Sequence, residues 1–328
     1  MKKFINDPEN LTAELLAGMV KAYPEKVQLS GEKLVCRANA KSEDKVAIVS
    51  LGGTGHEPAV QGFVGDGMLD VCACGDIWAA PGPPTLLEAL KKVKRDAGIL
   101  LVTLNHAGDV MSADMAKQMA EAEGITVKEI ITTEEIRPDA NEEGRGLGGC
   151  FLIYKLCGAA AEQGQNLDQI AALADKINSQ MATIAVLSEL ATHPSTGGVC
   201  GELGDDEMEI CAGQHGEGGG VRMKMTSSRE TVKILSDKVV EKLKLKSGDE
   251  IILLINGSGK TTLMEQYIAF NDASNYFEEM GVKVVGSHAG DILTVQEAGG
   301  YQLIVLKADS ELKDLWNAPC NTPGYTVV

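Results

Sequence analysis

Residues 45–50 read Lys-Val-Ala-Ile-Val-Ser, and the chain then turns through Gly52-Gly53-Thr54-Gly55. A short apolar run that ends in a glycine-dense turn is typical of a buried strand in a parallel sheet. The pattern recurs in residues 98–103, Gly-Ile-Leu-Leu-Val-Thr, which run into Asn105-His106-Ala107-Gly108-Asp109. Ligands of open α/β sheets bind beyond the carboxyl ends of the strands, so we expect a pocket where the two turns meet.

Helical and strand patterns alternate along the rest of the chain, which predicts two α/β domains, the first with a mostly parallel sheet flanked by helices. Asp7 and Pro8 are the N-cap and first residue of a helix over 8–22, and another helix has apolar positions near Met111, Met115 and Met119. The other expected helices cover residues 150–163, 167–190 and 229–243, and the other expected strands cover 127–131, 250–255, 282–285 and 303–306. A glycine-dense stretch over 192–222 places the domain boundary at 185/186, giving domains 1–185 and 186–328.

Composition excludes several classes of protein. The net charge of −17 over 328 residues argues against binding to a nucleic-acid backbone. The sequence has no apolar stretch of 18 residues and no apolar signal region behind Lys2-Lys3, so we expect a soluble cytoplasmic protein that does not bind a membrane. The eight cysteines include no C-x-x-C pair, and we expect Cys72 and Cys74 on opposite faces of a strand. No metal site is therefore expected.

Two of the three candidate site motifs lie in the strand-end turns. Gly53-Thr54-Gly55-His56-Glu57-Pro58 is not a dinucleotide fingerprint, because Pro58 stands where the third glycine belongs. His56 is either an exposed side chain on a tight turn or a hydrogen-bonding partner for a ligand hydroxyl. Asp109 is either an ordinary helix N-cap or a general base that accepts a hydroxyl proton.

The third motif is Gly213-Gln214-His215-Gly216-Glu217, followed by Gly218-Gly219-Gly220. A histidine flanked by glycines has no neighbouring bulk to bury it, which favours a functional role. His215-x-Glu217 also occurs in zinc deaminases, but the Pro-Cys-x-x-Cys partner is missing. Residues 256–261 resemble a P-loop, but Leu254 occupies the position of its first glycine, so we do not expect nucleotide binding there.

Together these residues resemble the K subunit of dihydroxyacetone (glycerone) kinase along nearly the whole chain. Gly53-Thr54-Gly55-His56-Glu57-Pro58 is similar to that family's Gly-Ser-Gly-His-Glu-Pro signature. Asn105, Gly108 and Asp109 fit its Asn-Tyr-Thr-Gly-Asp turn, and His215-Gly216-Glu217 fits its His-Gly-Glu-Pro-Gly turn. Further matches are the opening residues 1–8, residues 65–70 and residues 315–319.

The resemblance implies a site between the two domains with His56, Asp109 and His215 as its catalytic residues. The sugar carbonyl would form a hemiaminal with His215, while Asp109 and His56 contact the terminal hydroxyls. The implied substrate-binding residues are Gly53, Thr54, Gly55, His56, Asn105, Asp109 and His215. A neutral imidazole adds to a carbonyl but not to an alcohol, so this bond selects ketoses against glycerol.

The resemblance also implies the partners. The chain ends at Val328 without room for a nucleotide-binding module, which is the pattern of a homodimeric K subunit served by separate L and M subunits and phosphoenolpyruvate. No cofactor is expected on this chain, since ADP and magnesium belong to the L subunit. Two alternatives stay open: a ketose-binding coactivator of a transcription regulator, and a kinase subunit for a tetrose such as erythrulose. Departures from the family pattern at Leu104 and Ala80, where lysine and serine are usual, suggest the tetrose.

Overall fold

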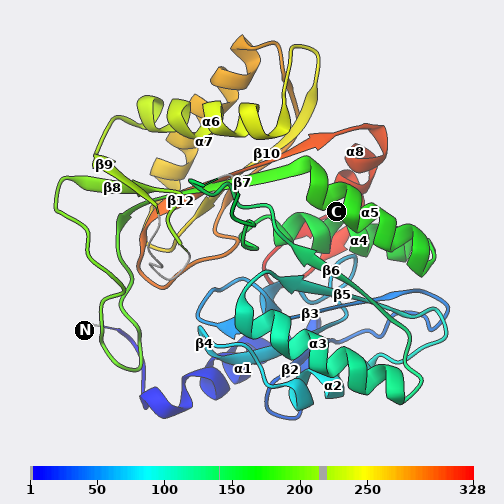
Figure 1. Ribbon diagram of the computed structural model, residues 1–328. Coiled ribbons are helices and arrows are strands. Elements are labelled where there is room, and N and C mark those ends of the chain that lie inside the picture. Colours follow the sequence, from blue (N-terminus) through cyan, green and yellow to red (C-terminus); the bar gives the residue numbers. More distant parts are fainter. Residues whose placement is uncertain (1–2, 140, 214–219) are drawn as a thin grey trace. The chain divides into compact units, whose positions relative to one another are not determined.

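The computed structural model describes residues 3–139, 141–213 and 220–328 (Figure 1). The chain forms two compact units, and each is discontinuous in sequence. The N-terminal unit comprises Lys2–Thr132, Cys150–Asn178 and Asp314–Val328, and the C-terminal unit comprises Thr133–Gly149 and Ser179–Lys313. This grouping differs from a single cut at 185/186, because the chain passes between the units several times.

The N-terminal unit is built on a six-stranded sheet in the order β1-β2-β4-β3-β5-β6. The central strands β3 (Ala47–Thr54), β4 (Val71–Ile77), β5 (Ile99–Leu104) and β6 (Val127–Thr132) pair in parallel. The edge strands β1 (Val27–Ser30) and β2 (Leu34–Arg37) add antiparallel pairings. The expected mostly parallel sheet is confirmed, and the apolar runs of β3 and β5 are buried as parallel strands require.

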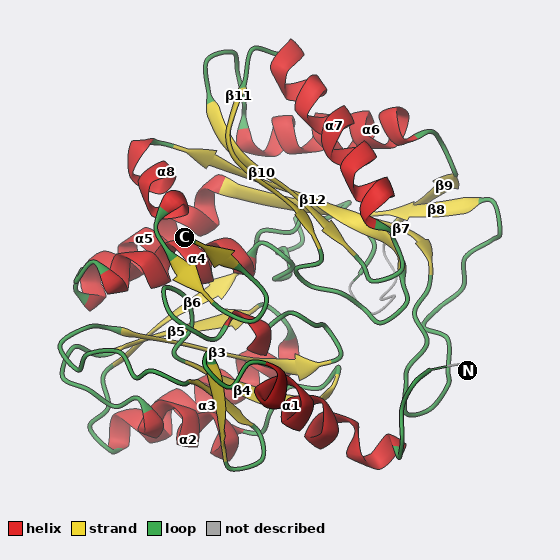
Figure 2. Ribbon diagram, turned by 180° about the vertical axis from the view of Figure 1, so that it is seen from behind, coloured by secondary structure: helices red, strands yellow, loops and turns green. Residues whose placement is uncertain are grey.

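Helices cover both faces of this sheet (Figure 2). On one face, α2 (Pro83–Lys92) and α3 (Ala107–Ala122) close a core of leucines and alanines from the helices and Val, Ile and Leu from the strands. On the other face, α4 (Cys150–Glu162) packs against β3 and β5. The unit also contains η1 (Pro8–Asn10), α1 (Leu11–Ala22), η2 (Gln61–Phe63), α5 (Leu167–Gln180), β13 (Cys320–Asn321) and β14 (Thr326–Val327). Asp7 caps the first of these helices, as predicted, by accepting a hydrogen bond from the Glu9 backbone.

The C-terminal unit has a second six-stranded sheet, in the order β11-β10-β12-β7-β8-β9. Only β10 and β11 pair in parallel among the described strands of this sheet. Two helices, α6 and α7, pack their apolar residues on one face of it (Figure 1). The bounds are β7 Met181–Glu189, β8 Glu207–Ile210, β9 Val221–Lys224, α6 Ser228–Leu243, β10 Glu250–Gly257, α7 Leu263–Glu279, β11 Lys283–Gly290 and β12 Gly299–Ala308. Helix α8 (Ser310–Asn317) contains residues of both units, because the division falls between Lys313 and Asp314.

Three details correct or complete the sequence predictions. The helix expected over 167–190 ends at Gln180, and residues 181–189 form strand β7, where Thr183, Ile184 and Val186 favour extended backbone. Cys72 and Cys74 share one face of β4, with their Sγ atoms 3.8 Å apart, because residues two apart in a strand point the same way. Within the described residues, no helix is both long enough and apolar enough to cross a membrane.

Candidate functional site

Three strand-end turns of the N-terminal unit meet at one edge of its sheet. β4, β3 and β5 are adjacent and parallel, so the turns after them emerge on the same side. A Cβ atom on Gly53 would lie 2.6 Å from the backbone nitrogen of Ala79, and a Cβ on Gly108 would lie 3.3 Å from the Cβ of Ala80. The turn after β4 therefore touches both of the turns that the sequence singled out.

The glycine turn after β3 is held by a glutamate that the sequence reasoning did not assign a role. One carboxylate oxygen of Glu57 accepts hydrogen bonds from the Gly55 backbone at 2.9 Å and from Gln61 at 2.8 Å. Trp78, in the turn after β4, also contacts the glycine turn, because its indole nitrogen donates a hydrogen bond to the carbonyl oxygen of Gly55 at 3.4 Å. Gly55 itself has a φ of 93°, which favours glycine. The only sequence signal for this brace is a carboxylate two residues after a turn glycine.

Thr54 is the last residue of β3, and its side chain faces the interior of the unit. Its hydroxyl is fully buried, lies 3.0 Å from the hydroxyl of Thr12 on α1, and donates to the carbonyl of Gly75 at 3.2 Å. These contacts fix the end of β3 against α1 and β4. Any contact between Thr54 and a ligand is therefore through its backbone.

Asp109 is not the N-cap of α3. The cap is His106, and Asp109 is the third residue of the helix, in its first turn. Its Oδ1 is buried and has no hydrogen-bond partner within the described residues. Burial raises the pKa of the Asp109 carboxyl to about 7. A carboxyl group with this pKa can both hold and release a proton near neutral pH, as a general base must.

The other predicted residues fall into two groups. His56, with 7% of its surface exposed, and Asn105 lie with Gly53, Thr54, Gly55 and Asp109 at the same sheet edge. His56 is thus buried rather than exposed. His215 lies outside the described residues, in the connection between β8 and β9.

The segment that resembles a P-loop, residues 256–261, uses side chains for contacts within the C-terminal unit. The side chain of Asn256 accepts hydrogen bonds from the backbones of Ile292 and Leu293 and donates to the carbonyl of Leu293. The ammonium group of Lys260 pairs with Glu189. These side chains hold the 291–293 loop and β7.

The close approach at Gly53 leads to a stability prediction. We expect Gly53→Ala to destabilise the protein by about 1–3 kcal/mol, because the new methyl group would push against rigid backbone at Ala79. Gly18→Ala is the matched control, since Gly18 lies exposed within α1 with no atom near the added methyl, and we expect a gain of about 0.5–1 kcal/mol. Urea unfolding followed by circular dichroism measures both. Equal effects of the two substitutions would contradict the close contact.

A glycine turn, a buried histidine and a partly buried carboxyl at the carboxyl edge of a parallel sheet are typical of an α/β protein that handles a small polar ligand. The comparison with known families agrees with this class. The Dak1 domain matches residues 17–324, so the chain belongs to the Dak1 domain family, and the resemblance seen in the sequence is confirmed.

Relatives in this family match the chain from end to end. The dihydroxyacetone-binding subunit DhaK of a PTS-dependent dihydroxyacetone kinase from Listeria innocua is 37% identical, over 99% of this chain and 100% of the relative. The DhaK subunit of the PEP-dependent kinase from Escherichia coli is 33% identical over 99% of both chains. Among solved structures, the dihydroxyacetone kinase operon co-activator Dha-DhaQ superposes with a TM-score of 0.90 at 29% identity, over 95% of this chain and 97% of that one.

Proposed function

We propose that this chain is the dihydroxyacetone-binding subunit of a phosphoenolpyruvate-dependent dihydroxyacetone kinase. The observation that carries the proposal is the end-to-end match to DhaK subunits at 33–37% identity. The carboxyl of Asp109, with its buried Oδ1, lies at the same sheet edge as the glycine turn and supplies the base that such a subunit needs. The expected partners are an L subunit, an M subunit acting through it, and a second copy of this chain.

The proposed binding step is an addition of His215 to the ketone. An imidazole nitrogen forms a bond to the carbonyl carbon, the carbonyl π electrons move to oxygen, and that oxygen gains a proton while the imidazole loses its N–H proton. The product is a neutral hemiaminal, so no other reactant is consumed. Glycerol has no carbonyl and is excluded by the same chemistry.

The proposed transfer step uses residues of the sheet edge. Asp109 accepts the proton of the terminal hydroxyl that attacks phosphorus, and His56 holds a hydroxyl of the bound sugar. On the L subunit, ADP would accept a phosphoryl group that comes from phosphoenolpyruvate through the M subunit, and the resulting ATP would donate its terminal phosphoryl group to the sugar hydroxyl and return to ADP. Magnesium would neutralise the charge of the phosphates. Positioning and charge stabilisation provide most of the catalysis of phosphoryl transfer, so a sugar fixed by a covalent bond suits this reaction.

The test is to titrate the protein with dihydroxyacetone labelled with ¹³C at its carbonyl carbon. We expect the ketone signal to be replaced by one in the range of a tetrahedral carbon. In His215→Ala we expect only the ketone and hydrate signals of the free sugar and an affinity at least about ten-fold lower, equivalent to about 1.4 kcal/mol. His193→Ala removes another histidine of the C-terminal unit and is the control that should still form the adduct. Unchanged sugar affinity in His215→Ala would show that the covalent step is wrong.

A second candidate, a non-catalytic coactivator that binds the ketose, is favoured by the structural likeness to the Dha-DhaQ co-activator. The two candidates share the adduct and differ in whether the bound ketose is then phosphorylated. Incubation with L subunit, M subunit, phosphoenolpyruvate and dihydroxyacetone separates them. Formation of dihydroxyacetone phosphate supports the kinase subunit, and an adduct without turnover supports the coactivator.

A further inference from the structure

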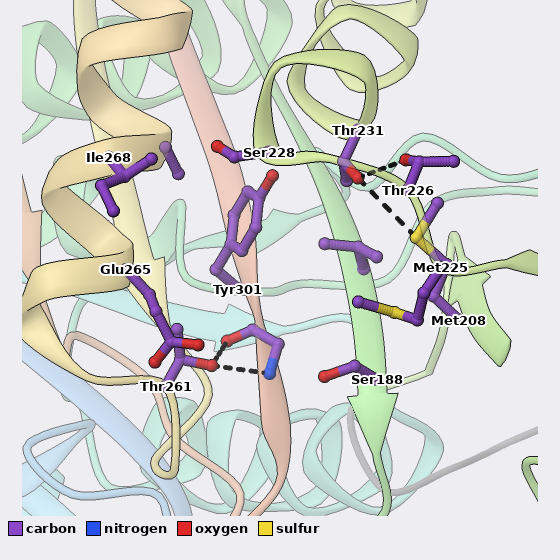
Figure 3. A pocket seen from close by; sticks show the side chains of 13 residues that line it. Ser188, Met208, Met225, Thr226, Ser228, Thr231, Thr261, Glu265, Ile268 and Tyr301 are labelled. Carbon is purple, nitrogen blue, oxygen red and sulfur yellow. Dashed lines mark hydrogen bonds between the residues drawn. The ribbon is translucent and has the colours of Figure 1, made fainter. Parts of the chain in front are cut away.

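The C-terminal unit contains a cavity of about 220 Å³ that the proposed kinase chemistry does not use (Figure 3). Its lining comes from β7, β8, β12, the N-terminal turns of α6 and α7 and the segments that lead into these two helices, all within one unit. Protein interiors contain few voids larger than a water molecule, and a void of about 150 Å³ with apolar walls is enough to bind benzene. This cavity is therefore large enough for a molecule somewhat larger than benzene.

The walls of the cavity are mainly apolar. Figure 3 shows the ring of Tyr301 among the lining side chains, which include Ile268 and the two methionines Met208 and Met225. Methionine side chains are flexible and polarisable, so they adapt to ligands of different shape and make favourable contacts with aromatic rings. Met225 and Ile268 are also about half exposed, at 51% and 47%, which gives access from solvent.

Most of the polar groups that line the cavity already have partners within the protein. The hydroxyl of Thr231 lies 2.8 Å from that of Thr226, and the hydroxyl of Ser228 donates to Asp272 at 2.7 Å. The hydroxyl of Thr261 accepts a hydrogen bond from the backbone nitrogen of Gly300 and donates to its carbonyl oxygen. These groups therefore offer little to a ligand.

Tyr301 differs from these groups. Its hydroxyl is buried and has no hydrogen-bond partner within the described part of the chain. Burial and the nearby carboxylate of Asp272 raise the pKa of this hydroxyl, which keeps it protonated and able to donate. A buried donor without a partner is unfavourable by about 1–3 kcal/mol, so a ligand that displaces the side chains covering this hydroxyl and accepts its hydrogen bond gains affinity.

The charges around the cavity select against anions. The lining residues include no lysine, arginine or histidine and one carboxylate, Glu265, within the described part of the chain. An anionic ligand would lose its hydration without gaining a counter-charge. We propose that this cavity is a binding site for a small, neutral, mainly apolar molecule about the size of a monosubstituted benzene that carries one hydrogen-bond acceptor, such as a ketone oxygen.

Three probes of similar shape test this ligand class: acetophenone, α-methylstyrene, which has CH₂ in place of the ketone oxygen, and the anion benzoate. We expect acetophenone to bind most tightly and benzoate at least about ten-fold more weakly. Tyr301→Phe should lower the affinity for acetophenone about three- to ten-fold and leave that for α-methylstyrene unchanged. Tyr276→Phe is the matched control, because the Tyr276 hydroxyl donates to Asp237 and lies outside the lining.

The position of the probes is checked by NMR of the protein labelled with ¹³C at its methionine methyl groups. We expect acetophenone to shift the signals of Met208 and Met225 and to leave those of the exposed methionines of α3 (Met111, Met115 and Met119) unchanged. Ala269→Leu, which fills part of the space, should weaken binding of both neutral probes at least about ten-fold. Circular dichroism melting shows whether each variant is folded.

Three results would overturn the proposal. The first is the absence of any shift of Met208 and Met225 with the neutral probes at millimolar concentration. The second is equal binding of benzoate and acetophenone. The third is a set of Met225 shifts that depend on protein concentration and not on the probe, which would show that a second copy of the chain covers this surface.

Discussion

Replacing Asp109 by Asn is expected to lower turnover about 10²- to 10⁴-fold in the assay with L subunit, M subunit and phosphoenolpyruvate. One oxygen of the carboxyl, Oδ1, is buried at the edge of the sheet, and Asn keeps the shape of the side chain but cannot accept a proton. The ketone adduct is expected to form as before, because the proposed covalent bond involves His215 alone. Asp114→Asn is the control, since Asp114 lies exposed on the same helix and should leave turnover unchanged.

The pH dependence of turnover depends on the pKa of Asp109, which burial raises to about 7. Only the ionised carboxylate accepts a proton, so we expect the rate to rise about ten-fold per pH unit below pH 7 and to level off above it. The raised pKa also means that the folded state favours the protonated form. Its contribution to stability is fully present below the pKa of about 3.9 in the unfolded chain and is lost as the pH rises through about 7.

Turnover and stability depend on the Asp109 carboxyl in different ways, so measuring both separates its role in catalysis from its effect on folding. Above pH 7 the native protein has to bury an ionised carboxylate at this position, whereas Asp109→Asn buries a neutral amide. We therefore expect the variant to be at least as stable as the native protein at about pH 8, although its turnover is lower. A variant that keeps full turnover, or that loses both turnover and the adduct, would contradict the assignment of Asp109 as the base.

The sequence predicted well those features that depend on local pattern. The strands expected at 45–50 and 98–103 are confirmed as β3 and β5, because an apolar run is a property of adjacent residues. The expected turn over 52–55 is placed too early, since β3 continues to Thr54 and the turn begins at Gly55. Periodicity also located α3 from its methionines. The buried face of that helix, however, is formed by Ser112, Ala113, Ala116 and Ala120, while its methionines are 42–65% exposed. Small residues allow close packing, and nothing local distinguishes the two faces.

Features that depend on distant partners could not be predicted. The hydroxyl of Thr54 is buried against Thr12, 42 residues away in sequence, so its structural role requires the folded chain. The Oδ1 atom of Asp109 lacks a hydrogen-bond partner within the described residues, and this likewise depends on the groups around it in space and not on its neighbours in sequence. Strand β7 was missed because Ala, Ile and Leu suit a helix as well as a buried strand, and its pairing with β12 decides between them.

Residues 65–70 match the family pattern, and the structure explains the last of them. Asp70 has 1% of its surface exposed, and its carboxylate accepts hydrogen bonds from Lys41 and from the backbone of Ile48, both at 2.8 Å. The guanidinium group of Arg37 lies 3.3 Å away on the other oxygen. One buried carboxylate thus holds two cations and the start of β3, the strand that ends in the glycine turn.

Asp70→Asn is expected to destabilise the N-terminal unit by about 3–5 kcal/mol. Among the described residues it leaves the two buried cations with only Glu162 and the half-exposed Asp66 as ion-pair partners. The matched control is Asp66→Asn, which removes a carboxylate from the same Arg37. Because the side chain of Asp66 is 48% exposed, we expect a loss of at most about 1 kcal/mol. Both tryptophans, Trp78 and Trp316, belong to this unit, so the urea midpoint of tryptophan fluorescence measures the effect.

A double substitution tests the cause of this loss. If the penalty comes from buried cations that have lost their partner, then Lys41→Met should recover part of the stability lost in Asp70→Asn, although it is destabilising in the native background. If the penalty comes from the lost hydrogen bond to the backbone of Ile48, the two losses add. Additive losses, or a loss in Asp70→Asn no larger than that in Asp66→Asn, would show that the pairing of charges around Asp70 does not hold β3 in place.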